Sequence, residues 1–211
     1  MVTPAGADRL SLTQLDDATR RLVRLAAQLA AASEQDVRVA LQAAHGVTPN
    51  AWIEELLLQT YLFAGFPRAL NGMREWRRIA AITATPPVTP EFRQAIGEAT
   101  CATVYGAMYQ KLRVNIRQLH PQLDEWMIEE GYGKVLSRPA LDLPRRELCI
   151  VAACAATGQD RQLQSHLHGA RNVGVPGSVV RAALDGLADL MDPAAHSRTL
   201  KLWARIDNDV H

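Results

Sequence analysis

Apolar residues recur every three or four positions along much of the chain, which is the spacing of one face of an amphipathic helix. Three such stretches follow one another in the first third of the sequence: Leu22, Leu25, Ala26 and Leu29; Val37, Ala40, Leu41 and Ala44; and Ile53, Leu56 and Leu57. No convincing run of alternating β-branched residues bounded by turns accompanies them. The pattern predicts a fold that is nearly all α.

Short segments with capping residues separate these predicted helices. Ser33 followed by Asp36 is typical of an N-cap with an acidic first turn. Gly46 is expected to end the second helix, and Pro49 to begin the third. Two further segments, Gly-Phe-Pro at residues 65–67 and Gly-Tyr-Gly at residues 131–133, are too short for phosphate-binding loops. We interpret both as helix breaks.

A proline-rich run at residues 83–90 cannot continue a helix and divides the chain into two halves. A weak internal repeat links the halves, because Gly46-Val47 and Gly174-Val175 each follow an Ala-rich helix and precede another. Duplication of a helical unit predicts a pseudo-twofold arrangement with a buried seam. We expect an N-terminal tail (residues 1–18), a first helical repeat (19–82), a linker with connecting helices (83–130) and a second repeat that carries the candidate site (131–211).

The balance of charge argues against large anionic partners. The chain has 211 residues, of which 48% are hydrophobic, and its 23 basic and 22 acidic residues give a formal net charge of +1. No global field would therefore concentrate nucleic acid or an anionic membrane at the surface. Small molecules or protein partners are the expected ligands.

Cysteine usage and the N-terminal sequence indicate the cytoplasm. Three cysteines form no secreted disulfide framework, and the first thirty residues lack a signal-peptide pattern. The apolar stretch at residues 22–32 is interrupted by Arg24 and Gln28 and is far shorter than the roughly 20 residues that cross a bilayer. We expect neither a membrane span nor, from the scattered histidines, a metal site.

The second half contains GYGKVLSRPALD at residues 131–142, then Arg146-Glu147, then HLHGARNVGV at residues 166–175. In the first half, EELLLQT at residues 54–60 leads to Gly-Phe-Pro at residues 65–67. These residues resemble the carboxymuconolactone decarboxylase family, which also includes the alkyl hydroperoxide reductase D-like peroxidases. The resemblance implies an all-α fold of two repeated helical units. It also implies a homo-oligomer, in which a duplicated chain forms a trimer that mimics a hexamer.

Glu147 and His166 are the candidate catalytic residues, and the resemblance assigns both to the family's site. On a helix, Glu147 and Cys154 are seven residues apart and nearly eclipsed, whereas Cys149 lies about 200° around from Glu147. His166 lies on or beside the apolar stripe of its own helix. A carboxylate and an imidazole in a partly apolar cavity form a general acid or proton shuttle.

For a γ-carboxylated unsaturated lactone, loss of carbon dioxide moves electrons onto the lactone carbonyl. Catalysis therefore needs a cation or hydrogen-bond donor at the carbonyl oxygen and an acid that reprotonates carbon. His166 and Glu147 could divide these roles. Arg138 or Arg146 would hold the carboxylate, and Gln162 and Cys154 complete the predicted substrate-binding set. No cofactor is expected.

Two alternatives remain open. The family's peroxidases use a Cys-x-x-Cys pair before the histidine, where this chain has Gln159 and Gln162. A thiol peroxidase would depend on Cys149 or Cys154, which lie about 140° apart on one helix, too divergent for an easy disulfide. The other alternative is a non-catalytic oligomeric scaffold or binding protein, which predicts a closed apolar site around His166 without a ligand-sized cavity.

Overall fold

The computed structural model describes residues 12–81 and 92–208, and every regular element in these ranges is helical. The predicted all-α class is confirmed. The helices are α1 (Asp17–Ala31), α2 (Glu34–Ala44), α3 (Asn50–Ala80), α4 (Arg93–Tyr105), η1 (Gly106–Met108), α5 (Tyr109–Leu119), α6 (Pro121–Trp126), η2 (Met127–Leu136), α7 (Leu143–Ala156), α8 (Asp160–Asn172), α9 (Gly177–Asp185), η3 (Ala188–Leu190) and α10 (Pro193–Asn208). None of the helices in the described ranges is long and apolar enough to cross a membrane.

The capping residues read from the sequence begin and end the first helices. The Ser33 side chain accepts a hydrogen bond from the Asp36 amide at the start of α2. Gly46, which follows α2, has a φ of +81°, a conformation that glycine adopts without steric cost. The three predicted N-terminal helices are therefore confirmed as α1, α2 and the first part of α3.

The break predicted at residues 65–67 is also confirmed. Gly65 has φ +81° and ψ 164°, and Pro67 follows it, so α3 consists of two helical segments joined at a kink. The proline-rich run at residues 83–90 lies outside the described residues.

The break predicted at residues 131–133 is wrong, because η2 continues through these residues as a π-helix. Gly133 of η2 and Gly97 of α4 instead allow the two helices to pack closely. A Cβ atom at Gly133 would lie 2.2 Å from the Arg93 carbonyl oxygen, and one at Gly97 would lie 2.2 Å from the Ile128 carbonyl oxygen. These contacts explain why α4 and η2 approach each other so closely.

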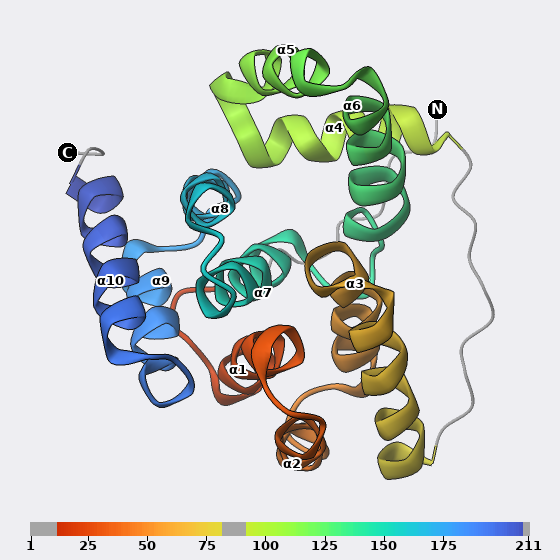
Figure 1. Ribbon diagram of the computed structural model, residues 1–211, viewed down its shortest axis with the longest axis vertical. Helices are drawn as coiled ribbons and strands as arrows, with labels where there is room; N and C mark the ends of the chain where they lie inside the picture. The colour runs from red at the N-terminus through yellow and green to blue at the C-terminus, as the bar shows by residue number, and fades with distance from the viewer. Residues whose placement is uncertain (1–11, 82–91, 209–211) are drawn as a thin grey trace.

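Helix α7 forms the centre of the molecule, between α1 and α8 (Figure 1). All eleven residues from Arg145 to Ala155 are buried. Around them pack fully buried side chains such as Leu22, Ile53 and Leu163, each of which stabilises the fold by about 1.5–3 kcal/mol. The central position of α7 makes it a rigid support for Glu147.

Helix α5 lies at the outer edge of the fold and contains no buried residue (Figure 1). It packs on α4 and α6. Arg113 and Arg117 of α5 both donate hydrogen bonds to Asp124 of α6, whose side chain is only 4% exposed. This ion-pair network fixes α5 relative to α6.

The first predicted repeat contains α1, α2 and α3, and the second contains α7, α8, α9 and α10. Gly174 after α8 has a φ of +91°, close to the value for Gly46 after α2. The boundary expected between residues 130 and 131 falls inside η2, so no helix end marks it. The duplication and the proposed domain limits stay predictions.

Candidate active site

Glu147 of α7 and His166 of α8 form a buried hydrogen-bonded pair. The distance from His166 Nδ1 to Glu147 Oε2 is 2.8 Å. The Glu147 side chain is fully buried and that of His166 is 7% exposed. The 19-residue separation in sequence thus places the two groups together across one helix-helix contact.

Local sequence places both residues. Asp142 caps α7 by accepting a hydrogen bond from the Arg145 amide at 2.9 Å, and Pro144 occupies the first turn, where its missing amide hydrogen has no cost. On α8, Gly169 follows His166 by three residues and lies on the same side of the helix. A Cβ atom at Gly169 would lie 2.5 Å from Glu147 Oε2, so glycine there leaves room for the carboxylate.

The Glu147 carboxylate is shielded from bulk solvent. Glu147 Oε1 is buried and has no hydrogen-bond partner among the described residues. Burial, together with the nearby Glu147 charge, raises the pKa of Cys154 to about 12. Burial also raises the pKa values of Tyr105 and Tyr132 above the ordinary tyrosine range, and the Glu147 charge adds to both shifts. These thiol and phenol groups are therefore neutral at physiological pH.

His166 lies in the wall of a cavity of about 730 Å³. The cavity is bounded by α3, α4, α5, α6, η2 and α8, and the lining residues include five aromatic side chains: Tyr61, Phe63, Tyr105, Trp126 and Tyr132. The His166 ring makes edge contacts with Phe63 and Tyr105, at centroid distances of 5.7 and 6.3 Å. Since Nδ1 is bonded to Glu147, Nε2 is the imidazole nitrogen left for a molecule in the cavity.

Comparison with known proteins gave a family match and a relative. Residues 121–202 match the carboxymuconolactone decarboxylase family. The matched segment runs from α6 into α10 and so contains both Glu147 and His166. The chain is also 28% identical over 157 residues to "Peroxisomal protein 2" of Schizosaccharomyces pombe, an alignment that covers 69% of this chain and 72% of that protein.

Within the family-matched segment, the structure brings only part of the predicted binding set to the cavity. Gln162 lines it together with His166. Cys154 is 3% exposed, and the Glu147 charge contributes to its raised pKa, but it does not line the cavity. Cys149 lies on another side of α7, against Ala26 and Ala30 of α1, as the helical geometry predicted.

The prediction that Arg138 or Arg146 holds a substrate carboxylate is wrong, because both side chains bind Glu55 of α3. Arg138 Nε lies 2.9 Å from Glu55 Oε2, and an Arg146 NH2 group lies 2.8 Å from the same oxygen. Arg146 is fully buried and donates further hydrogen bonds to Gln59 Oε1 and to the Leu141 and Arg138 carbonyl oxygens. Neither arginine lines the cavity, and together they fasten α3 to the start of α7.

The aromatic lining is the part of the site that sequence reasoning missed. Tyr61, Tyr105 and Tyr132 come from α3, α4 and η2, and no local spacing relates them. Gly169 did carry a signal, since it lies in the segment at residues 166–175 that resembles the family. Among residues 12–81 and 92–208, no group of three or more His, Cys, Asp or Glu side chains is arranged to hold a metal ion.

Proposed function

We propose that this chain is a cofactor-independent enzyme that transfers protons on a small lactone-type or related carbonyl compound, with Glu147 and His166 as its acid/base pair. The observation that carries the proposal is the 2.8 Å contact between the fully buried Glu147 carboxylate and Nδ1 of His166, whose ring lies in the wall of a ligand-sized cavity. The family match over the same residues supports it.

Glu147 acts by positioning the imidazole. Its carboxylate accepts a hydrogen bond from Nδ1–H, which holds the proton on Nδ1 and leaves a lone pair on Nε2. Nε2 can then take a proton from substrate carbon and return it. The burial of Glu147 strengthens its interaction with the imidazolium formed in this step.

Tyr105 is the proposed hydrogen-bond donor to the substrate carbonyl oxygen. It lines the cavity beside His166, and its raised pKa keeps its hydroxyl protonated. A neutral phenol in a site of low polarity stabilises negative charge that develops on a carbonyl oxygen during proton transfer.

The two alternative functions receive less support. Burial raises the pKa of Cys101 and Cys154 to about 12 and that of Cys149 further, and none of the three lines the cavity, so a thiolate nucleophile is not available. A non-catalytic scaffold predicts a closed site around His166, whereas the cavity there is of ligand size.

Hydrogen-deuterium exchange at the carbon next to the carbonyl of unsaturated five-membered lactones, followed by NMR in D₂O, tests the proposal. We expect exchange above the buffer rate, reduced about 100-fold or more in His166→Gln. His168→Gln is the matched control, because His168 is exposed two residues away on the same helix. Exchange at the buffer rate, or equal rates in the wild type and His166→Gln, contradicts the proposal.

Assembly and location also belong to the proposal. The chain is expected to form a homo-oligomer, with a trimer as the specific expectation, and the lack of buried residues on α5 supports a further contact there. Light scattering of the purified protein measures this mass. The cytoplasm remains the expected compartment, and the relative named as peroxisomal makes the peroxisome the competing outcome of a localisation experiment.

A further inference from the structure

The charged side chains that line the cavity are all acidic. They are Glu125 of α6 and Glu129 and Glu130 of η2, and no Lys or Arg is found among the described lining residues. Glu125 is exposed and Glu129 and Glu130 are half-buried, so these carboxylates repel an anion through partly screened charge. A carboxylated substrate would therefore meet like charge from these three side chains, and no Lys or Arg among the described lining residues would contact it directly.

The cations nearest to this cavity are bound elsewhere. Arg138 and Arg146 are paired with Glu55. Lys134 lies 2.8 Å and Arg93 4.0 Å from Glu130, and neither cation lines the cavity. Each of these four cations already has a carboxylate partner, and none of them lines the cavity where a substrate carboxylate would lie.

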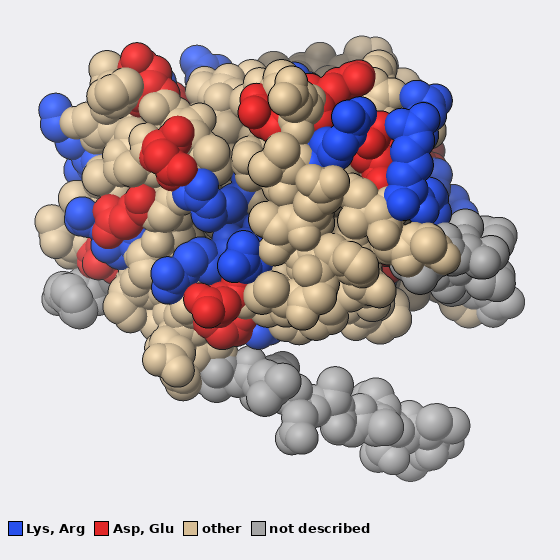
Figure 2. All heavy atoms as spheres, turned by 90° about the horizontal axis from the view of Figure 1, so that it is seen from below, with Lys and Arg blue, Asp and Glu red and all other residues tan. Residues whose placement is uncertain are grey.

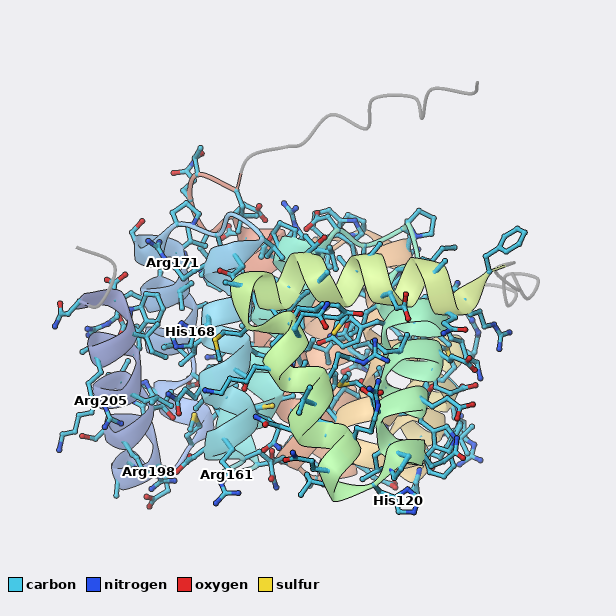
Figure 3. All side chains as sticks on the ribbon, turned by 90° about the horizontal axis from the view of Figure 1, so that it is seen from above. His120, Arg161, His168, Arg171, Arg198 and Arg205 are labelled. Carbon is cyan, nitrogen blue, oxygen red and sulfur yellow. The ribbon has the colours of Figure 1, made fainter. Side chains whose placement is uncertain are left out.

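Basic residues gather on other faces of the molecule. Arg161, His168 and Arg171 of α8 lie along the side that neighbours α10, away from α5 and α6 (Figure 3). Figure 2 shows Lys and Arg side chains gathered on the side seen from below, opposite α5. A hollow between α1 and α2 there is lined by Arg20, Arg21 and Arg24. The acidic character of the cavity is thus a local property.

The remaining lining suits an uncharged molecule. Leu112 and Ile116 of α5 and the aromatic side chains supply apolar contact. The Tyr61 hydroxyl is buried and has no hydrogen-bond partner among the described residues, so it is free to bond to a ligand oxygen. Apolar walls with a few hydrogen-bonding groups are typical of sites for small neutral compounds.

From this lining we infer that the substrate is an uncharged unsaturated lactone or similar carbonyl compound without a carboxylate, and that the reaction moves a proton between carbons and releases no carbon dioxide. This inference rests on the proposed function. His166 Nε2 takes the proton next to the carbonyl, and the C–H electron pair passes through the carbonyl onto oxygen. The electrons then return to form a C–H bond at the far end of the conjugated system, with the same proton delivered from Nε2. The double bond shifts by one position, and atoms and charge balance without a co-reactant.

A matched pair of ligands tests the inference: a methyl-substituted β,γ-unsaturated five-membered lactone and the same lactone with a carboxymethyl group in place of the methyl group. Binding and double-bond migration are followed by NMR, and carbon dioxide release is followed separately with an α,β-unsaturated five-membered lactone that carries a carboxylate on its γ carbon. We expect the wild type to bind the neutral lactone at least about tenfold more tightly than the carboxylated one.

Leu112→Arg is the diagnostic variant, because it adds a cation to the cavity wall from the outer helix α5. It is expected to reverse the preference by improving binding of the carboxylated lactone at least about tenfold. Val114→Arg is its control, since Val114 is exposed on the same helix and does not line the cavity. That variant should leave both affinities unchanged.

The outcomes separate the inference from the proposed function. Equal or tighter wild-type binding of the carboxymethyl lactone, or carbon dioxide release from the γ-carboxylated lactone, overturns the inference and leaves the proposed acid/base catalysis intact. Preference for the neutral lactone without any proton exchange supports the inferred ligand class and overturns the proposed function.

Discussion

The Glu147 carboxylate occupies the space that a side chain at Gly169 would need. A Cβ atom at Gly169 would lie 2.5 Å from Glu147 Oε2, the same oxygen that bonds to His166 Nδ1. One face of α8 therefore supplies the imidazole and, one turn later, the gap into which the carboxylate fits.

Gly169→Ala tests this relationship. The added methyl group must displace the Glu147 carboxylate or separate α7 from α8, because Val104 Cγ1 also lies 2.8 Å from the Cβ position. We expect a stability loss of about 1–3 kcal/mol from overpacking, despite alanine's better helix propensity, and a large loss of lactone proton exchange. Urea unfolding and the NMR exchange rate measure the two effects.

Gly131→Ala provides the stability control. A Cβ atom there meets nothing within 4 Å, so the variant should be neutral or up to about 1 kcal/mol more stable. If Gly169→Ala behaves like Gly131→Ala, the close approach of α8 to Glu147 has no energetic importance.

Glu147→Gln separates a catalytic from a structural role for the pair. The substitution keeps the shape of the side chain but removes a buried charge with one unpaired oxygen, so stability should stay within about 1 kcal/mol or rise. The amide can donate to Nδ1, which moves the proton to Nε2 and removes the base. We expect proton exchange to be lost. A loss of several kcal/mol in urea unfolding would instead make the pair a structural element.

Arg146→Leu tests the structural assignment of this arginine. The Glu55 side chain is only 5% exposed, and without Arg146 its ion-pair partner among the described residues is Arg138. We expect the free energy of unfolding to fall by about 3–5 kcal/mol. Arg181→Leu is the control, because the exposed pair of Arg181 with Asp185 should contribute less than about 1 kcal/mol. Unchanged stability combined with weaker substrate binding would return Arg146 to the binding set.

The thiols should be unreactive in the native protein. With pKa values raised to about 12 by burial, Cys101 and Cys154 have about one thiolate in ten thousand at pH 8. We expect a thiol reagent to modify all three cysteines quickly in denaturant and none quickly under native conditions. Fast native modification of Cys154 would revive a thiol peroxidase function.

The same shifts determine a pH dependence of stability. The native state keeps the two thiol protons above the ordinary cysteine pKa of 9.0, where the unfolded chain loses them. The contribution of these thiols to the free energy of unfolding is therefore complete below about pH 9 and is lost as the pH rises toward about 12. Chemical unfolding between pH 8 and 11 should show this decline, and Cys154→Ala should reduce its slope.

Local features of the sequence predicted much of the fold. Capping at Ser33, termination at Gly46 and the kink at Gly65 depend on residues within one or two turns, so they could be read without the tertiary structure. The break predicted at residues 131–133 is wrong because the role of Gly133 depends on α4, more than thirty residues earlier, which approaches the backbone there.

The sequence by itself determined the helical class and indicated Glu147 and His166 as a pair, because helical periodicity and motif spacing are properties of the local chain. Only the tertiary structure decided which charges reach the cavity. Arg146 is adjacent to Glu147 in sequence, yet its guanidinium binds Glu55 of α3, while three glutamates from α6 and η2 line the cavity. Electrostatic interactions depend on distance and burial in space, and neither of these can be read from positions along the chain.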